Sequence, residues 1–289
     1  MARYYRPDTL AEALAIRAEK VITVLAGGTD IVPARTARAG WGDMSRTDIL
    51  DVSRLQELRG IDETADGYRF GALTTWTELR RAALPAAFAG WQAAAKDVGG
   101  RQVQNRGTIA GNLCTASPAG DGIPCLLSLD AAVELTSAGG VRTVPVGDFV
   151  TGYRTTALRA DELVTAVVVP RPAEGAVGAF AKLGARRYLV ISIAMAAGVI
   201  AVGEDGRIRS AALAVGACSA RAQRLLRLEA ALVGVPAGAA VSAVEPELLD
   251  ELTPIDDIRA SGDYRRAAAL TLVRDIVGGL AGDGERRVA

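Results

Sequence analysis

The sequence predicts an α+β fold in two parts, and three observations support this expectation. Short β-branched runs and helix-like segments follow one another through the first half of the chain. Pro170 and Pro172 then interrupt the pattern. Beyond them, three longer apolar runs separated by turn residues indicate a meander, after which helical patterns return. We therefore expect the chain to divide into residues 1–171 and residues 172–289.

The first part is expected to open with a helix. Thr9 and Glu12 fit a capping box, and Leu10 and Leu14 fall on one helical face. Arg17 lies beside that face, so we expect its charge to point to solvent. The run 137–140, Ser-Ala-Gly-Gly, indicates a hairpin turn. Further along, strands are expected at residues 21–25, 49–52, 68–73, 132–136, 141–146 and 163–169, and helices at residues 77–83 and 88–98.

The second part is expected to be a small antiparallel sheet followed by helices. Strands are expected at residues 178–183, 191–202 and 208–216, and helices at residues 220–233, 246–252 and 262–280. Ser261 or Asp263 could cap the last helix. Residues 283–289 are expected to be a frayed tail.

Composition limits the partners of the protein. The chain has 289 residues, and its 33 basic side chains balance its 33 acidic ones, so nothing favours nucleic acid or an anionic membrane. Its first residues lack the apolar run of a signal peptide. The longest apolar stretch, residues 189–203, is shorter than the roughly 20 residues that span a bilayer. We expect a soluble, cytoplasmic protein without a membrane span.

Two absences limit the kinds of active site and cofactor that this chain can hold. The chain contains no histidine, which excludes a Ser-His-Asp triad, a histidine-ligated metal and a flavin tethered to histidine. Its cysteines, Cys114, Cys125 and Cys218, lie far apart, so neither an iron–sulfur cluster nor a zinc site is expected, and no cysteine is expected to tether a flavin. Any redox work therefore requires an organic cofactor.

Four segments have the composition of a cofactor site. Residues 26–30 (AGGTD) follow a strand, and glycines there let backbone amides approach an anion such as a diphosphate. Residues 105–112 (NRGTIAGN) and 117–121 (SPAGD) are rich in small polar residues and end in Asp121, a possible acceptor for ligand hydroxyls. Residues 152–158 (GYRTTAL) and the cationic run around Lys182 complete the set. Taken singly, residues 26–30 are more typical of an ordinary turn and residues 105–121 of a polar loop, and the cationic run would be interpreted as a solvated loop.

Taken together, and with residues 261–266 (SGDYRR), these segments resemble the FAD-binding medium subunits of the molybdenum hydroxylases, such as those of carbon monoxide dehydrogenase and xanthine dehydrogenase. The order and spacing of the motifs match over nearly the whole chain. The resemblance implies a PCMH-type FAD-binding domain of two α+β subdomains over residues 1–171. A C-terminal α+β domain like that of the carbon monoxide dehydrogenase flavoprotein would follow over residues 172–289.

The resemblance also implies which residues contact non-covalently bound FAD. Lys182 would stabilise the reduced flavin if it reaches the pyrimidine edge. No catalytic residue and no metal ligand is expected in this chain. The implied contacts are Val24, Leu25, Ala26, Gly27, Gly28, Thr29, Asp30, Ile31, Val98, Thr108, Ile109, Ala110, Gly111, Asn112, Asp121, Leu163 and Lys182.

By the same resemblance, the chain is expected to be an electron relay. A large subunit would carry the molybdenum cofactor, and a small subunit with [2Fe–2S] clusters would pass electrons to FAD, which would deliver them to an external acceptor. A dimer of heterotrimers is the expected assembly, with Arg186, Arg187, Tyr188 and residues 264–266 as candidate contacts. Two alternatives are a self-contained PCMH-type flavin oxidoreductase and a flavin-binding or assembly module without turnover.

Overall fold

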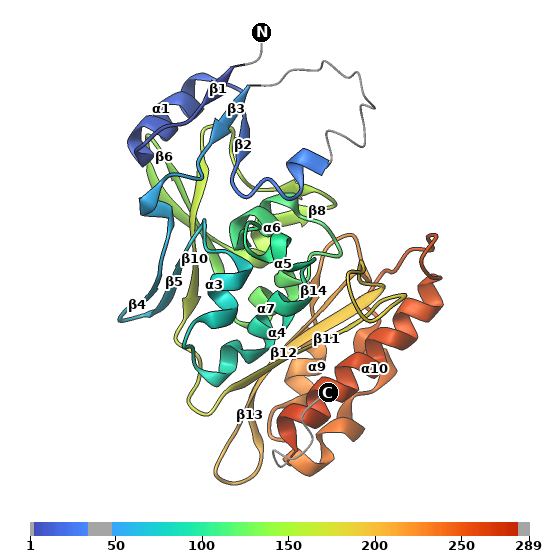
Figure 1. Ribbon diagram of the computed structural model, residues 1–289. Coiled ribbons are helices and arrows are strands. Elements are labelled where there is room, and N and C mark those ends of the chain that lie inside the picture. Colours follow the sequence, from blue (N-terminus) through green and yellow to red (C-terminus); the bar gives the residue numbers. More distant parts are fainter. Residues whose placement is uncertain (1–2, 34–47, 283–289) are drawn as a thin grey trace.

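The computed structural model describes residues 3–33 and 48–282. The predicted tail at residues 283–289 lies outside these ranges. The α+β expectation is confirmed: mixed helices and small sheets form an N-terminal part and a C-terminal part that pack together (Figure 1).

The chain begins with a small parallel sheet. Its strand order is β1-β3-β2, formed by Tyr4–Tyr5, Ile49–Asp51 and Thr23–Leu25. Helix α1 (Leu10–Glu19) packs beside it, and the side chain of Thr9 accepts a hydrogen bond from the amide of Glu12, as the capping pattern predicts. The expectation for Arg17 was wrong. Its side chain is half-buried and donates to the carbonyls of Ile22 and Glu162.

A five-stranded antiparallel sheet forms the centre of the N-terminal part. Its order is β4-β5-β10-β6-β7, with bounds Ile61–Glu63, Gly67–Gly71, Leu163–Pro170, Ala132–Ser137 and Gly140–Pro145. Ser137 pairs with Gly140, so the predicted hairpin is confirmed. A short hairpin of β8 (Val150–Gly152) and β9 (Thr155–Thr156) precedes β10.

Short helices connect these strands. They are η1 (Gln56–Leu58), α3 (Trp76–Arg81), η2 (Ala86–Phe88), α4 (Ala89–Asp97), α5 (Arg101–Gln104), α6 (Ile109–Thr115), α7 (Gly122–Ser128) and α8 (Val146–Phe149). The sequence predicts α3 and α4 to within one or two residues at each end. It does not predict α6 and α7, because their many small residues give no clear helical period.

The C-terminal sheet is antiparallel with order β11-β12-β13-β14. Its strands are Val177–Leu183, Ala194–Val202, Ile208–Gly216 and Gln223–Arg224. The predicted helix over residues 220–233 was partly wrong. Residues 223–224 pair with β13 instead, and only α9 (Leu226–Leu232) is helical. Backbone pairing with a buried strand overrides the helical preference of this segment.

Helix α10 (Gly262–Ala281) closes the chain, and the Ser261 side chain caps it by accepting from the amide of Tyr264. Two 3₁₀ segments, η3 (Ala237–Ala243) and η4 (Pro246–Leu249), precede it; η4 replaces the helix predicted at residues 246–252. Helix α10 lies along one face of the C-terminal sheet, while α4 and α7 contact the other (Figure 1).

The two parts meet backbone to backbone where α4 crosses β11. A Cβ atom on Gly178 would lie 2.1 Å from the carbonyl oxygen of Ala87, and one on Gly90 would lie 2.6 Å from that of Ala179. Side chains from the sheet, including Met195 and Ala214, join the core of the N-terminal part. The parts therefore share a core. Within the described residues, no helix has the length and apolar character needed to cross a bilayer.

Candidate functional site

The first predicted cofactor loop lies at the end of β2, against the second. A Cβ atom on Gly27 would lie 1.9 Å from the carbonyl oxygen of Arg106, a contact that real side chains do not make. Only glycine therefore lets residues 26–30 lie directly on the backbone of residues 106–107. Gly28 has φ +75°, a left-handed conformation that also favours glycine.

The amides of this loop are available to a ligand. Among the residues that the structure describes, the backbone N–H groups of Gly27, Gly28, Thr29 and Asp30 donate no hydrogen bond. A helix begins directly afterwards, at Ile31. Backbone donors without a partner need water or a ligand, and several converging amides make a site for an anion.

The second loop ends in the first turn of α6. Thr108 caps this helix, with its hydroxyl accepting a hydrogen bond from the amide of Gly111 at 3.0 Å. The amide of Ile109 donates to the carbonyl of Thr74, whereas the amide of Ala110 has no acceptor among the described residues. The chain thus offers free donors on both loops.

The two loops form the walls of a cleft of about 590 Å³. This volume lies within the range of small-molecule and cofactor sites, about 300–1,000 Å³. Thirteen of the seventeen predicted contact residues line the cleft: Val24, Ala26, Gly27, Gly28, Thr29, Asp30, Ile31, Val98, Thr108, Ala110, Gly111, Asn112 and Leu163. The structure therefore brings together residues that are widely separated in the sequence.

Four predicted contact residues do not line this cleft. They are Leu25, Ile109, Asp121 and Lys182. The side chain of Ile109 belongs to the hydrophobic core. Leu25 lies in β2, where it pairs with Asp51.

Asp121 and Lys182 form a buried ion pair instead. The Nζ atom of Lys182 lies 2.6 Å from Oδ2 of Asp121, and the hydroxyl of Ser192 donates to Oδ1 at 2.6 Å. Burial raises the pKa of Asp121, and the Lys182 ammonium opposes this shift. Asp121 was expected to accept hydrogen bonds from ligand hydroxyls, but in this structure both of its carboxylate oxygens accept from protein groups.

Several lining residues were missed by sequence reasoning. Arg17 and Arg154 bring cations to the cleft, and Arg154 pairs with Asp30 at 3.6 Å. Arg154 lies within the GYRTTAL motif, which gave a signal without singling out this residue. No sequence signal pointed to Arg17, because only the fold turns its side chain inward.

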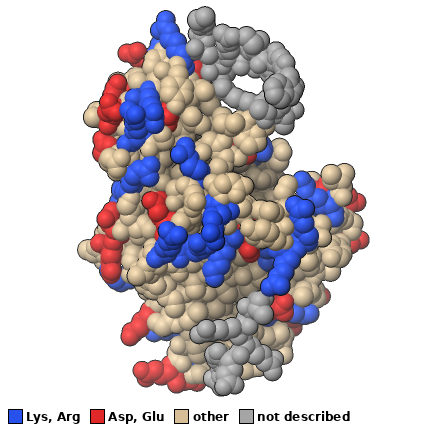
Figure 2. Space-filling model, viewed as in Figure 1, with Lys and Arg blue, Asp and Glu red and all other residues tan. Residues whose placement is uncertain are grey.

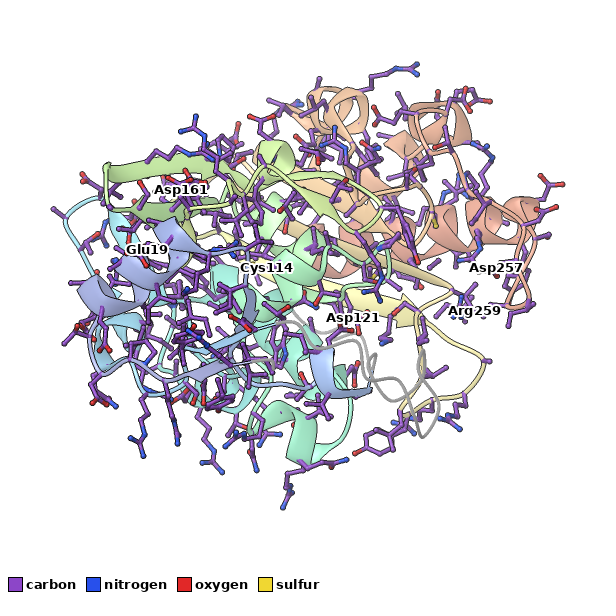
Figure 3. The ribbon with its side chains drawn as sticks, turned by 90° about the horizontal axis from the view of Figure 1, so that it is seen from above. Glu19, Cys114, Asp121, Asp161, Asp257 and Arg259 are labelled. Carbon is purple, nitrogen blue, oxygen red and sulfur yellow. The ribbon has the colours of Figure 1, made fainter. Side chains whose placement is uncertain are left out.

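Cys114, labelled in Figure 3, also lines the cleft. The expectation that no cysteine tethers the flavin stays a prediction. Its accessible surface faces the cleft, and the surrounding walls desolvate the thiol, raising its pKa to about 12. The group is therefore a neutral thiol at physiological pH rather than a nucleophilic thiolate.

These features fit an elongated cofactor with a central diphosphate, such as FAD. Gly27 lies directly on the backbone of Arg106, Gly28 takes a left-handed conformation, and the amides of both are free for the anion. Apolar residues, including Val98, Leu163 and Val164, line other parts of the cleft and suit planar rings.

Comparison with known proteins supports this fit. Residues 1–172 match the family described as the FAD binding domain in molybdopterin dehydrogenase, and residues 179–279 match the C-terminal domain of the CO dehydrogenase flavoprotein. The nicotinate dehydrogenase FAD-subunit of Eubacterium barkeri is 34% identical over 244 residues, 81% of this chain and 80% of that relative. A putative xanthine dehydrogenase FAD-binding subunit of Escherichia coli is 31% identical over 285 residues, 96% of this chain and 94% of that relative.

The fold agrees with these matches. A chain of the reconstituted CO dehydrogenase from Oligotropha carboxidovorans superimposes with a TM-score of 0.89 at 27% identity, covering 97% of this chain and 98% of that one. The N-terminal and the C-terminal part of the chain therefore both have structural counterparts in that protein. The chain belongs to the FAD-binding subunits of the molybdopterin dehydrogenases, oxidoreductase components of carbon monoxide and xanthine dehydrogenase-like complexes.

Proposed function

We propose that this chain relays electrons, taking them from the [2Fe–2S] clusters of a partner subunit and passing them to an external acceptor. The observation that carries the proposal is the cleft between the two loops, whose free amides suit the diphosphate of FAD. Bound FAD supplies a centre that accepts two electrons and releases them again. The chain's own residues hold and orient that cofactor and adjust its electrostatic surroundings.

The loops at residues 24–31 and 108–112 would bind the diphosphate and neighbouring groups. Val98 and Leu163 would contact the rings. Lys182 and its partner Asp121 do not themselves line the cleft, but Gly120, the neighbour of Asp121, does, so the pair would lie next to the edge of the flavin. We further propose that residues 1–171 are the FAD-binding domain and residues 172–289 the C-terminal domain. The interruption at Pro170 and Pro172 supports this boundary.

The partners in this proposal are a large molybdenum-cofactor subunit and a small [2Fe–2S] subunit, arranged as a dimer of heterotrimers. Relatives are named as subunits or as the medium chain of a dehydrogenase, which supports a multi-subunit enzyme. We place the complex in the cytoplasm. The three cysteines are free thiols, which is typical of a reducing compartment.

One end of the C-terminal part presents the surface that we propose contacts a partner. Tyr188, Leu189 and Ile191 are exposed in the loop between β11 and β12, and Ile255 and Ile258 are exposed in the loop before α10. A cluster of exposed apolar side chains is typical of an interaction site.

Arg265 joins these two loops, because its guanidinium donates to the carbonyl of Ile193 at 2.5 Å and to Asp257 at 2.7 Å. Arg265 was expected to be an exposed contact residue, but its side chain is buried, so that expectation was wrong. Its neighbour Tyr264 is exposed.

Positive charge accompanies this surface. Arg186 and Arg187 are exposed beside Tyr188, whereas the charge of Arg259 is paired with Asp257 at 3.0 Å (Figure 3). Lys and Arg side chains also gather across the middle of the face shown in Figure 2. Because the whole chain has zero net charge, this uneven distribution favours a partner with an acidic docking face.

Reconstitution tests the relay. The isolated chain should hold FAD, yet no aldehyde, purine or N-heterocycle should bleach its flavin absorbance in stopped-flow measurements. Bleaching should appear when the molybdenum and iron–sulfur subunits are added. If a hydroxylation substrate bleached the flavin of the lone chain, the self-contained oxidoreductase would replace the relay.

A further inference from the structure

Among the residues that the structure describes, none forms an ion pair with Arg17, whose charge lies in the cofactor cleft. This residue lies in the last turn of α1, outside the glycine loops, and its side chain lines the cleft. Its Nη1 atom donates to the carbonyl of Ile22 at 2.8 Å and its Nε atom to the carbonyl of Glu162 at 3.3 Å. Both acceptors are neutral, so these bonds orient the guanidinium without neutralising it.

The surroundings make this charge costly. Burial lowers the pKa of Arg17, and Asp161 and Cys114 only partly oppose that effect. Asp161 is exposed and makes no ion pair with Arg17, and the carboxylate of Glu162 is held by Arg142. A half-buried charge without a counter-ion is unfavourable unless something else compensates it.

The other ionisable groups of the cleft do not compensate Arg17. The described lining residues include four such groups: Arg17, Asp30, Cys114 and Arg154. Asp30 and Arg154 pair with each other, and the thiol of Cys114 is neutral. Among the described lining residues, Arg17 therefore leaves an excess of one positive charge.

We propose that Arg17 is an electrostatic determinant of FAD affinity, attracting the cofactor's diphosphate through the low-dielectric cleft. This inference rests on the cleft being the FAD site. The diphosphate is the anionic part of oxidised FAD, while the free amides of the two loops give it directional hydrogen bonds. The charge of Arg17 matters here more than the shape of its guanidinium, since an attraction of this kind does not require direct contact.

A purely structural role makes a different prediction. If Arg17 served only to join α1, residue 22 and residue 162, its loss would weaken the binding of every ligand of the cleft equally. An electrostatic role weakens only the ligands that carry phosphate. Riboflavin, which lacks phosphate, separates the two roles when its affinity is compared with that of FAD.

The experiment measures dissociation constants of FAD and riboflavin for the deflavinated full-length chain and its Arg17→Met and Arg17→Lys variants, at low and moderate salt. Lys20→Met is the matched control, because it removes a cation from the same end of α1 that does not line the cleft. Thermal melts of each apo variant report whether the fold is intact.

We expect Arg17→Met to weaken FAD binding about 10-fold, equivalent to about 1.4 kcal/mol. Riboflavin affinity should change little, and the salt dependence of FAD binding should become shallower. Arg17→Lys should recover most of the affinity, and Lys20→Met should behave like the parent protein.

Equal weakening of FAD and riboflavin, or unchanged FAD affinity in Arg17→Met, would overturn the proposal. If Arg17→Met did not fold, two measurements would still separate the electrostatic role from the structural one. They are the affinities of Arg17→Lys for FAD and riboflavin and the salt dependence of FAD binding by the parent protein. Failure of the parent protein to bind FAD would instead contradict the assignment of the cleft itself.

Discussion

Lys182 and Asp121, one on β11 and the other directly before α7, form a buried ion pair with 2.6 Å between Nζ and Oδ2. Ser192 completes the arrangement by donating to the second carboxylate oxygen. The two charges nearly cancel, so the effect of either residue on a nearby cofactor depends on the other.

This pairing predicts opposite shifts in the reduction potential of bound FAD. Lys182→Met removes the positive member and should lower the two-electron potential by some tens of millivolts, since about 30 mV corresponds to 1.4 kcal/mol. Asp121→Asn leaves the ammonium without its counter-ion and should raise it by a similar amount. Spectroscopic redox titration of each variant gives the values, and shifts of the same sign would show that the pair does not act on the flavin electrostatically.

Substitutions at the glycines should affect FAD retention unequally. Gly27→Ala should separate the two loops, because the new Cβ would meet the carbonyl of Arg106, and Gly28→Ala should add backbone strain of about 1 kcal/mol or more. Gly111→Ala should be milder, since its Cβ meets only Oγ1 of Thr108, at 2.9 Å. The ratio of flavin to protein absorbance after gel filtration measures retention.

Gly238→Ala provides the matched control, because a Cβ at that position meets nothing within 4 Å. It should keep the full complement of FAD. Retention by Gly27→Ala equal to that of the control would contradict the place of this loop in the site.

FAD should be released completely by acid precipitation, although Cys114 lines the cleft. A thiol whose pKa is raised to about 12 is protonated at neutral pH and is a weak nucleophile. The Cys114→Ser variant should bind FAD as the parent does. Yellow colour that stays with the protein pellet, and disappears in Cys114→Ser, would reveal a covalent link through this residue.

The exposed loop between β11 and β12 should contribute to assembly. Tyr188→Ala should weaken association with the partner subunits roughly tenfold, because an aromatic residue at the centre of an interface often contributes more than 1 kcal/mol. Leu226→Ala, an exposed apolar residue on α9, is the control. Titration calorimetry against the partner subunits compares them, and equal affinities would remove this loop from the interface.

Asp257 should make stability depend on acid pH. Burial alone would raise its pKa, but hydrogen bonds from the amide of Arg259, the Arg265 guanidinium and the amide of Ala260 lower it to about 2. A carboxyl whose pKa is lower in the folded state stabilises the protein above the unfolded value, 3.8, and this contribution is lost as the pH falls toward 2. Chemical denaturation between pH 5 and pH 2 should therefore show a steeper loss for the parent than for Asp257→Asn; parallel curves would contradict this.

Local chemistry determined several features that the sequence alone predicts. The turn at residues 137–140, the Thr9 and Ser261 caps and the C-terminal meander depend on neighbouring residues, so their patterns are visible in the chain. The glycine loops also belong here. Glycine permits a left-handed backbone such as that of Gly28, and this tolerance belongs to the residue itself.

Only the tertiary structure decided which distant groups meet. Gly27 touches the backbone of Arg106, Lys182 pairs with Asp121, and Arg265 is buried between two loops that the sequence places far apart. Arg17 turns toward the cleft because the carbonyls of residues 22 and 162 converge on it, and no helical pattern contains that information. Residues 223–224 form a strand for a related reason. Their pairing with β13 outweighs a local preference for helix, because long-range contacts contribute free energy that neighbouring residues cannot encode.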